Sequence, residues 1–111
     1  MSRLSEKKCS VCEGGVLPLD LSAAKIYLAD VPSWDLDKTG TSIERKFSFK
    51  GYYATMSFVN AVAYVAQQEG HHPDMKVGYN YCHISFTTHA IAGLSENDFI
   101  CAAKINDLVS T

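Results

Sequence analysis

Alternation of hydrophobic and polar residues predicts a β-hairpin in the first half of the chain. The longer strand of this hairpin, expected over 42–49, places Ile43, Phe47 and Phe49 on one side and mostly charged or small polar residues on the other. A shorter strand is expected over 34–37, and a Lys-Thr-Gly turn separates the two. This alternation is typical of a strand with one buried and one solvated face.

A second hairpin is predicted in the second half of the chain, with strands over 75–79 and 81–88 and with Asn80 near the turn. In a strand, every second residue shares a face. The apolar face of the longer strand carries Cys82, Ile84 and Phe86, and the opposite face carries His83, Ser85, Thr87 and His89. We therefore expect His89 at the end of a strand, beside the loop that leads into the last helix.

Three helices are predicted around these hairpins. Apolar residues at helical spacing indicate a first helix over 19–31, with Ser22 helping to cap its start. The longest periodic segment, 53–69, carries an apolar stripe and is followed by Gly70, a residue type that favours helix ends. A last helix is expected to open with Ser95 as its cap.

The order of these elements predicts the fold class. Sequential hairpins indicate an antiparallel sheet, so we expect an α+β fold in which a four-stranded antiparallel sheet carries three helices on one face. The other face of the sheet is expected to be polar or covered by another chain. Unpaired sheet edges and a second apolar strip on the helix over 53–69 favour a homo-oligomer.

Length and composition fit one globular domain. The chain has 111 residues, of which 47% are hydrophobic and 20% charged. We interpret residues 1–15 as a flexible polar arm and 16–111 as a single domain. The start of the chain lacks the apolar core of a signal peptide, and no apolar run reaches the roughly 20 residues of a membrane span, so we expect a cytoplasmic protein without membrane contact.

The charge balance argues against a nucleic-acid partner. Lys and Arg number 10 against 12 Asp and Glu, a formal net charge of -2. Proteins that bind nucleic acid usually carry a basic excess or a basic stripe. This sequence has neither, so we expect no nucleic acid among the partners.

All four histidines fall between residues 71 and 89, and they are the candidates for chemistry. Histidine titrates near neutral pH, so such a cluster is a candidate site of proton transfer. His71 and His72 precede Pro73, which favours an extended backbone and directs the two rings to opposite sides. For His83, a surface or structural role is the simpler interpretation. A catalytic zinc is less favoured, because the sequence has no helical His-Glu-x-x-His pattern.

The four cysteines do not define a metal site or a disulfide framework by themselves. Cys9 and Cys12 have the spacing of half a zinc knuckle, whereas Cys82 and Cys101 are isolated. Because nothing in the sequence indicates secretion, we expect reduced thiols. A zinc-binding regulatory protein centred on Cys9 and Cys12 stays an alternative, mainly through a site shared between molecules.

A long motif in the second half of the chain resembles pterin-4a-carbinolamine dehydratase. It consists of His71-His72-Pro73-Asp74, Tyr79, Thr87-Thr88-His89 and the run from Gly93 to Asp98. The spacing His-His-Pro-x5-Tyr-x9-His-x8-Asp is similar to that of the family from end to end, and the resemblance extends back to cover residues 16 to 108. One position departs from the pattern, since the family usually carries Glu where this chain has Gln67.

The resemblance implies a function. The family dehydrates 4a-hydroxytetrahydropterin, the product of aromatic amino-acid hydroxylases, to quinonoid dihydropterin and water in pterin cofactor recycling. It implies the fold derived above, a pterin substrate, an aromatic amino-acid hydroxylase as functional partner, a homotetramer or homodimer, and no cofactor or metal. The implied catalytic residues are His71, His72 and His89, and the implied substrate-binding residues are Pro73, Asp74, Tyr79, Thr88 and Asp98.

Histidine chemistry suits this reaction. The 4a-hydroxyl is a poor leaving group unless protonated, and N5 must lose its proton, so the reaction needs one general acid and one general base near neutral pH. Three histidines can supply both, and on sequence grounds either role fits either ring. The alternative is a non-catalytic pterin-binding or dimerisation-cofactor protein of the same fold, but the presence of His71, His72 and His89 favours the enzyme.

Overall fold

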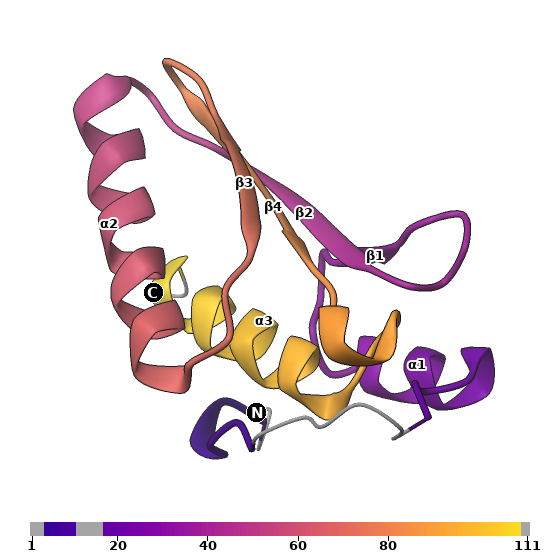
Figure 1. The fold of residues 1–111 in the computed structure, drawn as a ribbon. Helices are drawn as coiled ribbons and strands as arrows, with labels where there is room; N and C mark the ends of the chain where they lie inside the picture. Colours follow the sequence, from indigo (N-terminus) through magenta and orange to yellow (C-terminus); the bar gives the residue numbers. More distant parts are fainter. Residues whose placement is uncertain (1–3, 11–16, 110–111) are drawn as a thin grey trace.

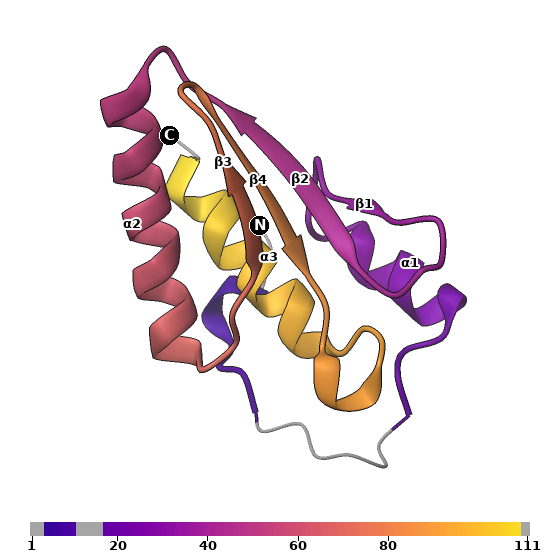
Figure 2. The ribbon, with the colours of Figure 1, turned by 45° about the horizontal axis from the view of Figure 1, so that its top comes forward.

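The four strands of this chain form one antiparallel sheet in the order β1-β2-β4-β3, as seen in a computed structural model that describes residues 4–10 and 17–109 (Figure 1). The strands are β1 (Asp35–Leu36), β2 (Ile43–Ser48), β3 (Asp74–Val77) and β4 (Tyr81–Phe86). The α-helices are α1 (Leu21–Leu28), α2 (Tyr52–Glu69) and α3 (Glu96–Val109), and they lie together on one side of the sheet (Figure 1 and Figure 2). The predicted α+β class and its arrangement of helices on one face are confirmed.

The hydrophobic face of the sheet packs against α3 to form the core. Register pairs Ile43 of β2 with Phe86 of β4, and Phe47 with Cys82, and all four side chains are buried. The buried apolar residues of α3 are Phe99, Ile100, Cys101, Ala102, Ala103 and Ile105. Fully burying a Phe or Ile side chain stabilises a fold by about 1.5–3 kcal/mol, so this layer holds α3 firmly beneath the strands.

No helix within the described ranges is long and apolar enough to cross a membrane.

The opposite face of the sheet is polar, which is one of the two outcomes predicted. Glu44, Lys46 and Ser85 stand on it, and none of them is buried. His83 pairs with Glu44 there, with 3.0 Å between His83 Nε2 and Glu44 Oε1. This face points away from the helices, so His83 lies on the sheet surface, where Glu44 is its partner. The interpretation of His83 as a surface or structural residue agrees with this position.

Several predicted boundaries are wrong: the first helix, expected over 19–31, is shorter at both ends, and both strands of the second hairpin end two residues early. Helix α1 begins after Asp20, whose side chain accepts a hydrogen bond from the Ala23 backbone N–H at 2.8 Å, so Asp20 and not Ser22 is the cap. Strand β4 ends at Phe86, because Thr88 instead pairs with Gly93 in an isolated bridge. That bridge closes a 3-10 turn, and the turn, rather than the strand, carries His89.

Part of the segment interpreted as a flexible arm is attached to the domain. Residues 4–10 run beside α3 (Figure 1), and Leu4 is only 5% exposed. The Lys104 ammonium donates to the Ser5 carbonyl at 2.8 Å, and the Cys9 backbone N–H donates to Glu69 Oε1 at 2.8 Å. The segment is therefore held by α3 and by the last residue of α2. The remaining residues of the predicted arm lie outside the described ranges.

Leu4→Ala should reduce the free energy of unfolding by about 2 kcal/mol, because it removes a buried side chain that anchors the N-terminal segment. Leu17→Ala is the matched control, since Leu17 is 86% exposed and its truncation should change stability by less than about 0.5 kcal/mol. Urea denaturation followed by circular dichroism measures both. Equal effects of the two substitutions would contradict the packing of residues 4–10 described here.

Candidate active site

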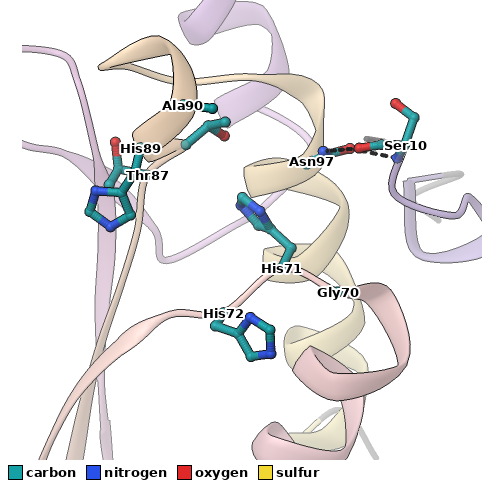
Figure 3. A pocket seen from close by; sticks show the side chains of 9 residues that line it. Ser10, Gly70, His71, His72, Thr87, His89, Ala90 and Asn97 are labelled. Atoms are coloured by element: carbon teal, nitrogen blue, oxygen red, sulfur yellow. Dashed lines mark hydrogen bonds between the residues drawn. The ribbon is translucent and has the colours of Figure 1, made fainter. Parts of the chain in front are cut away.

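A cavity of about 350 Å³ opens beside the loop that follows β4 (Figure 3). This volume is within the range of about 300–1,000 Å³ that small-molecule sites occupy. The cavity is lined by Ser10, Gly70, His71, His72, Thr87, Thr88, His89, Ala90 and Asn97. The structure thus brings together the three histidines predicted to be catalytic, although they come from two separate parts of the chain. Figure 3 shows His71 and His72 on one side and His89 on the other.

The end of α2 places His71 in the cavity wall. Helix α2 ends at Glu69 and is capped by Gly70, which adopts the left-handed conformation (φ 63°) that glycine accepts at little cost. The chain then turns away from the helix axis, and the His71 backbone N–H still bonds to the Ala66 carbonyl at 3.2 Å. The His71 ring stacks on Phe86, with centroids 5.7 Å apart and planes 7° apart. Packing therefore holds the ring in one orientation.

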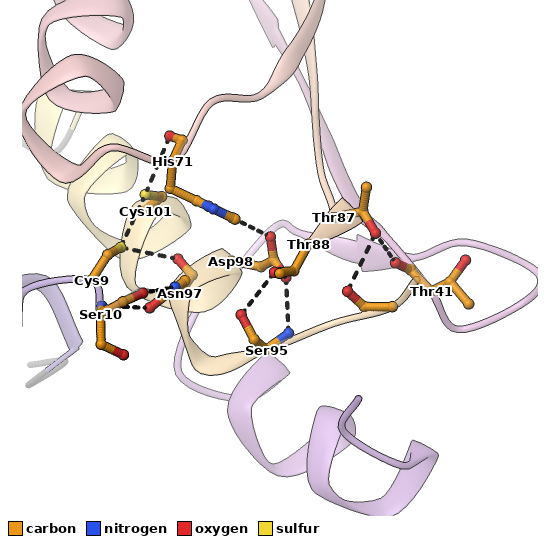
Figure 4. A network of polar contacts seen from close by, with 11 residues as sticks. Cys9, Ser10, Thr41, His71, Thr87, Thr88, Ser95, Asn97, Asp98 and Cys101 are labelled. Atoms are coloured by element: carbon orange, nitrogen blue, oxygen red, sulfur yellow. Dashed lines mark hydrogen bonds and ion pairs between the residues drawn. The ribbon is translucent and has the colours of Figure 1, made fainter. Parts of the chain in front are cut away.

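A buried carboxylate, that of Asp98, also holds the His71 ring, through its Nε2 atom (Figure 4). His71 Nε2 lies 2.6 Å from Asp98 Oδ1, and the Asp98 side chain is fully buried. The other carboxylate oxygen accepts hydrogen bonds from the Thr88 hydroxyl at 2.8 Å and from the Ser95 backbone N–H at 2.9 Å. A buried carboxylate needs such donors, and Asp98 also benefits from its place in the first turn of α3.

The same network explains the role of Ser95, which was predicted to cap the last helix with its side chain. Its hydroxyl lies 2.8 Å from the Thr88 hydroxyl. Because Thr88 uses its own proton to bond Asp98, Ser95 must be the donor in this pair. The side chain of Ser95 therefore supports the Asp98 network, and Asp98 caps the Ser95 backbone N–H in return.

The contact with Asp98 determines which nitrogen of His71 is available for chemistry. A carboxylate only accepts hydrogen bonds, so Nε2 of His71 must carry the proton that it donates to Asp98. In a neutral ring, Nδ1 is then left with its lone pair. A carboxylate fixes the tautomer of a catalytic histidine in this way in Ser-His-Asp triads. The His71 side chain is 12% exposed, so the ring is mostly shielded from water.

His72 and His89 are held more loosely than His71. Both side chains are exposed. His72 Nε2 lies 3.4 Å from Gln67 Oε1. Gln67, which stands where the family usually carries Glu, therefore faces His72 and not His71. The His89 ring has no hydrogen-bond partner within residues 4–10 and 17–109; its backbone is held by the 3-10 turn, which Ala92 closes in a left-handed conformation (φ 54°). These two rings can exchange protons with solvent readily.

Four of the five residues predicted to bind substrate do not line the cavity. Pro73 follows directly on His72 and shapes the exit of the chain from the site. Asp74 opens β3 as an exposed residue opposite Ser85. Tyr79 lies in the turn between β3 and β4, at the far end of β4 from His89, where its ring stacks on Tyr52 at 6.3 Å. Asp98 does not line it either, because its side chain is fully buried behind His71. Only Thr88 of the five lines the cavity, and all five roles in substrate binding stay predictions.

Five lining residues had not been predicted as site residues from the sequence: Ser10, Gly70, Thr87, Ala90 and Asn97. Two of them, Asn97 and Ser10, hold each other. The buried Asn97 side chain holds the Ser10 backbone in both directions: the Ser10 N–H donates to Asn97 Oδ1 at 3.1 Å, and Asn97 Nδ2 donates to the Ser10 carbonyl at 2.6 Å (Figure 3). Asn97 lies inside the recognised Gly93–Asp98 run, so its position was a usable signal. Ser10 had no signal, because nothing in a polar N-terminal segment indicates where it docks.

The described residues contain no group of three or more His, Cys, Asp or Glu side chains that could hold a metal ion. Of the two cysteines considered for a shared zinc site, Cys9 lies against α3, with its sulfur 3.6 Å from that of Cys101. Cys12 lies outside the described ranges.

The sequence is similar to a family described as pterin 4 alpha carbinolamine dehydratase, whose model matches residues 17–108. A protein of Nitrosomonas eutropha that is named after pterin-4-alpha-carbinolamine dehydratase is 57% identical over 107 residues, which is 96% of this chain and 93% of the relative. A protein of Legionella pneumophila with the same name is 50% identical over 109 residues, or 97% of this chain and 96% of the relative.

Two solved structures have a similar fold. The crystal structure of a transcriptional coactivator/pterin dehydratase from Brucella melitensis superposes with a TM-score of 0.79 at 27% identity and covers 82% of this chain and 97% of its own. A pterin dehydratase-like protein identified as a RuBisCO assembly factor in the alpha-carboxysome superposes with a TM-score of 0.62 at 24% identity, over 71% of this chain and 92% of its own. The latter likeness concerns the fold alone.

Thr88→Val should lower the free energy of unfolding by about 1–3 kcal/mol, because it leaves a buried oxygen of Asp98 with one donor fewer. The exposed Thr39, whose hydroxyl also donates to an aspartate, provides the control: Thr39→Val should cost less than about 0.5 kcal/mol. Chemical denaturation compares the two. A Thr88→Val protein as stable as Thr39→Val would show that the Asp98 carboxylate is not as dependent on its buried donors as inferred.

Proposed function

This chain belongs to the pterin 4 alpha carbinolamine dehydratase family, and we propose that it dehydrates 4a-hydroxytetrahydropterin to quinonoid dihydropterin and water. The observation that carries the proposal is the short His71–Asp98 contact of 2.6 Å in the wall of a cavity that His72 and His89 also line. The reaction removes a hydroxyl from C4a and a proton from N5 and forms the C4a=N5 double bond. It needs proton transfer and a site of the size of a bicyclic ring.

His71 is proposed as the general base. Its Nδ1 lone pair takes the N5 proton, while the Nε2–H stays bonded to Asp98. The imidazolium that forms is then stabilised by the buried carboxylate, as in the Ser-His-Asp triad. Because Phe86 and Asp98 hold the ring, little reorientation is needed before the proton moves.

His89 is proposed as the general acid. It lies on the opposite side of the cavity from His71 (Figure 3), so a pterin ring between them would meet a base on one side and an acid on the other. Its exposed ring can take up a proton from solvent and deliver it to the leaving 4a-hydroxyl, which departs as water. His72, which Gln67 contacts, is assigned to orienting the substrate.

The biological setting is proposed from the family alone. We place the reaction in pterin cofactor recycling, after an aromatic amino-acid hydroxylase has formed the carbinolamine, in the cytoplasm and in a homotetramer or homodimer. A non-catalytic role is the second candidate, because the fold also occurs in a protein named as a RuBisCO assembly factor. The histidine cluster around the cavity favours catalysis, since a scaffold needs no such cluster.

His71→Ala and His89→Ala should each lower the rate of carbinolamine loss by about 10²–10⁴-fold, the usual contribution of a general acid or base. The rate is followed by stopped-flow absorbance on hydroxylase-generated substrate, with the uncatalysed rate subtracted at each pH. The wild-type profile should be bell-shaped; His71→Ala should lose its acidic limb and His89→Ala its alkaline limb.

His83→Ala is the control for this series. His83 lies on the polar face of the sheet beside Glu44, away from the cavity, so its removal should leave the rate within about two-fold. A loss in His83→Ala comparable to that in His89→Ala would contradict the site. A wild-type protein that binds pterin without accelerating dehydration would favour the non-catalytic candidate.

Asp98→Asn should abolish most activity by reversing the tautomer of His71. The Ser95 N–H and the Thr88 hydroxyl both require an acceptor, so the amide oxygen must face them and the amide NH2 must face His71. Nε2 then has to accept, and the proton moves to Nδ1, where it blocks the base. We expect a loss of about 10²–10⁴-fold in kcat with little change in KM.

The same substitution at Asp107, an exposed carboxylate on α3, provides the matched control and should be silent. The tautomer is read independently of activity from the ¹⁵N chemical shifts of His71. An Asp98→Asn protein that keeps Nε2 protonated, or keeps its kcat, would refute the assigned role of Asp98.

A further inference from the structure

Two thiols meet where the N-terminal segment lies against α3. Cys9 Sγ is 3.6 Å from Cys101 Sγ (Figure 4), although the two residues are far apart in the sequence. Both are free cysteines; Cys101 is buried and Cys9 is partly exposed. A disulfide bond is about 2.05 Å long, so the sulfurs must approach further. Residues 8–10 have no regular secondary structure and can supply that movement.

The surroundings give the two thiols different reactivities. The hydrogen bond with Cys9, followed by burial, raises the pKa of the Cys101 thiol far above its usual range. Cys101 therefore stays protonated, and Cys9 is the thiol that an external reagent can reach. Burial also raises the pKa of Cys82, which lies fully buried on the inner face of β4. Once Cys9 is modified, its sulfur can no longer carry the negative charge that opposes ionisation of Cys101.

We propose that Cys9 and Cys101 form a thiol–disulfide exchange site that takes low-molecular-weight disulfides of the glutathione type. In the first step the Cys9 thiolate attacks the disulfide, forms a mixed disulfide and releases one thiol. In the second step the Cys101 thiol loses its proton as its sulfur attacks the Cys9 sulfur; the mixed-disulfide bond breaks, and the leaving thiolate takes up a proton to become the second thiol. Overall, two protein thiols are oxidised, one disulfide is reduced to two thiols, and reduced glutathione reverses the reaction.

The new bond would fasten the N-terminal segment to the helix that carries Asp98. Ser10, the neighbour of Cys9, lines the cavity, where Asn97 already holds it through two hydrogen bonds. The Cys101 thiol is also 4.0 Å from the His71 carbonyl oxygen. Oxidation therefore acts directly beside the candidate active site. It adds a covalent bond between Cys9 and α3 to the two hydrogen bonds that already hold Ser10 to Asn97.

The test uses the reduced, full-length protein and oxidised glutathione. Intact mass should fall by two hydrogens, and a proteolytic digest should contain a peptide pair joined through Cys9 and Cys101. The melting temperature should rise by about 5 °C or more, because a cross-link over this length of chain restricts the unfolded state strongly. These measurements involve no pterin, so they succeed or fail independently of the dehydratase activity.

Variants separate the proposed pair from other linkages. In a Cys12→Ser background, which leaves Cys9 as the only cysteine outside the buried pair Cys82 and Cys101, Cys101→Ser should stop at one glutathione on Cys9, and Cys9→Ser should react with none under the same conditions. Cys12→Ser and Cys82→Ser should form the same Cys9–Cys101 link as the wild type. A link from Cys9 to Cys12, loss of the oxidation in Cys12→Ser, or a wild-type protein that accumulates only the mixed disulfide would overturn the proposal.

Discussion

The candidate site depends on one buried carboxylate, that of Asp98. A carboxylate removed from water must be matched by donors, or the fold loses several kcal/mol. Its partners come from three separate places: His71 after α2, Thr88 after β4, and the backbone N–H of Ser95 before α3. Satisfying Asp98 therefore requires these three segments to meet, so the same interaction that stabilises the fold also assembles the site.

This arrangement divides the three histidines that line the cavity into one that is fixed and two that are held more loosely. His71 is held by Asp98 and by stacking on Phe86, which together fix the orientation of its ring in the cavity wall. His72 and His89 are exposed and can exchange protons with water. A base benefits from a fixed tautomer, whereas an acid that must be recharged in each cycle benefits from solvent access. The fold provides both environments within one cavity.

Helix α3 organises this end of the molecule. Its first turns carry Asp98, which holds His71, and Asn97, which holds the backbone of Ser10. One turn further along, Cys101 meets the thiol of Cys9. The hydrophobic core fixes the buried face of this helix, so Asn97, Asp98 and Cys101 stand on a rigid element.

Local patterns in the sequence determined the two hairpins and the histidines that share the cavity. Alternation of apolar residues predicted both hairpins, and the spacing of His71, His72 and His89 within a family-like motif singled out the histidines that share the cavity. These features depend on residues that are close in the sequence or on a motif, and both can be identified from the sequence alone.

The tertiary structure alone decided where His89 and Ser10 lie. His89 leaves the strand because Thr88 pairs with Gly93, and Ser10 reaches the cavity because a buried amide far along the chain holds its backbone. Such contacts join residues with no periodic relation, so no pattern in the sequence specifies them before the chain has folded.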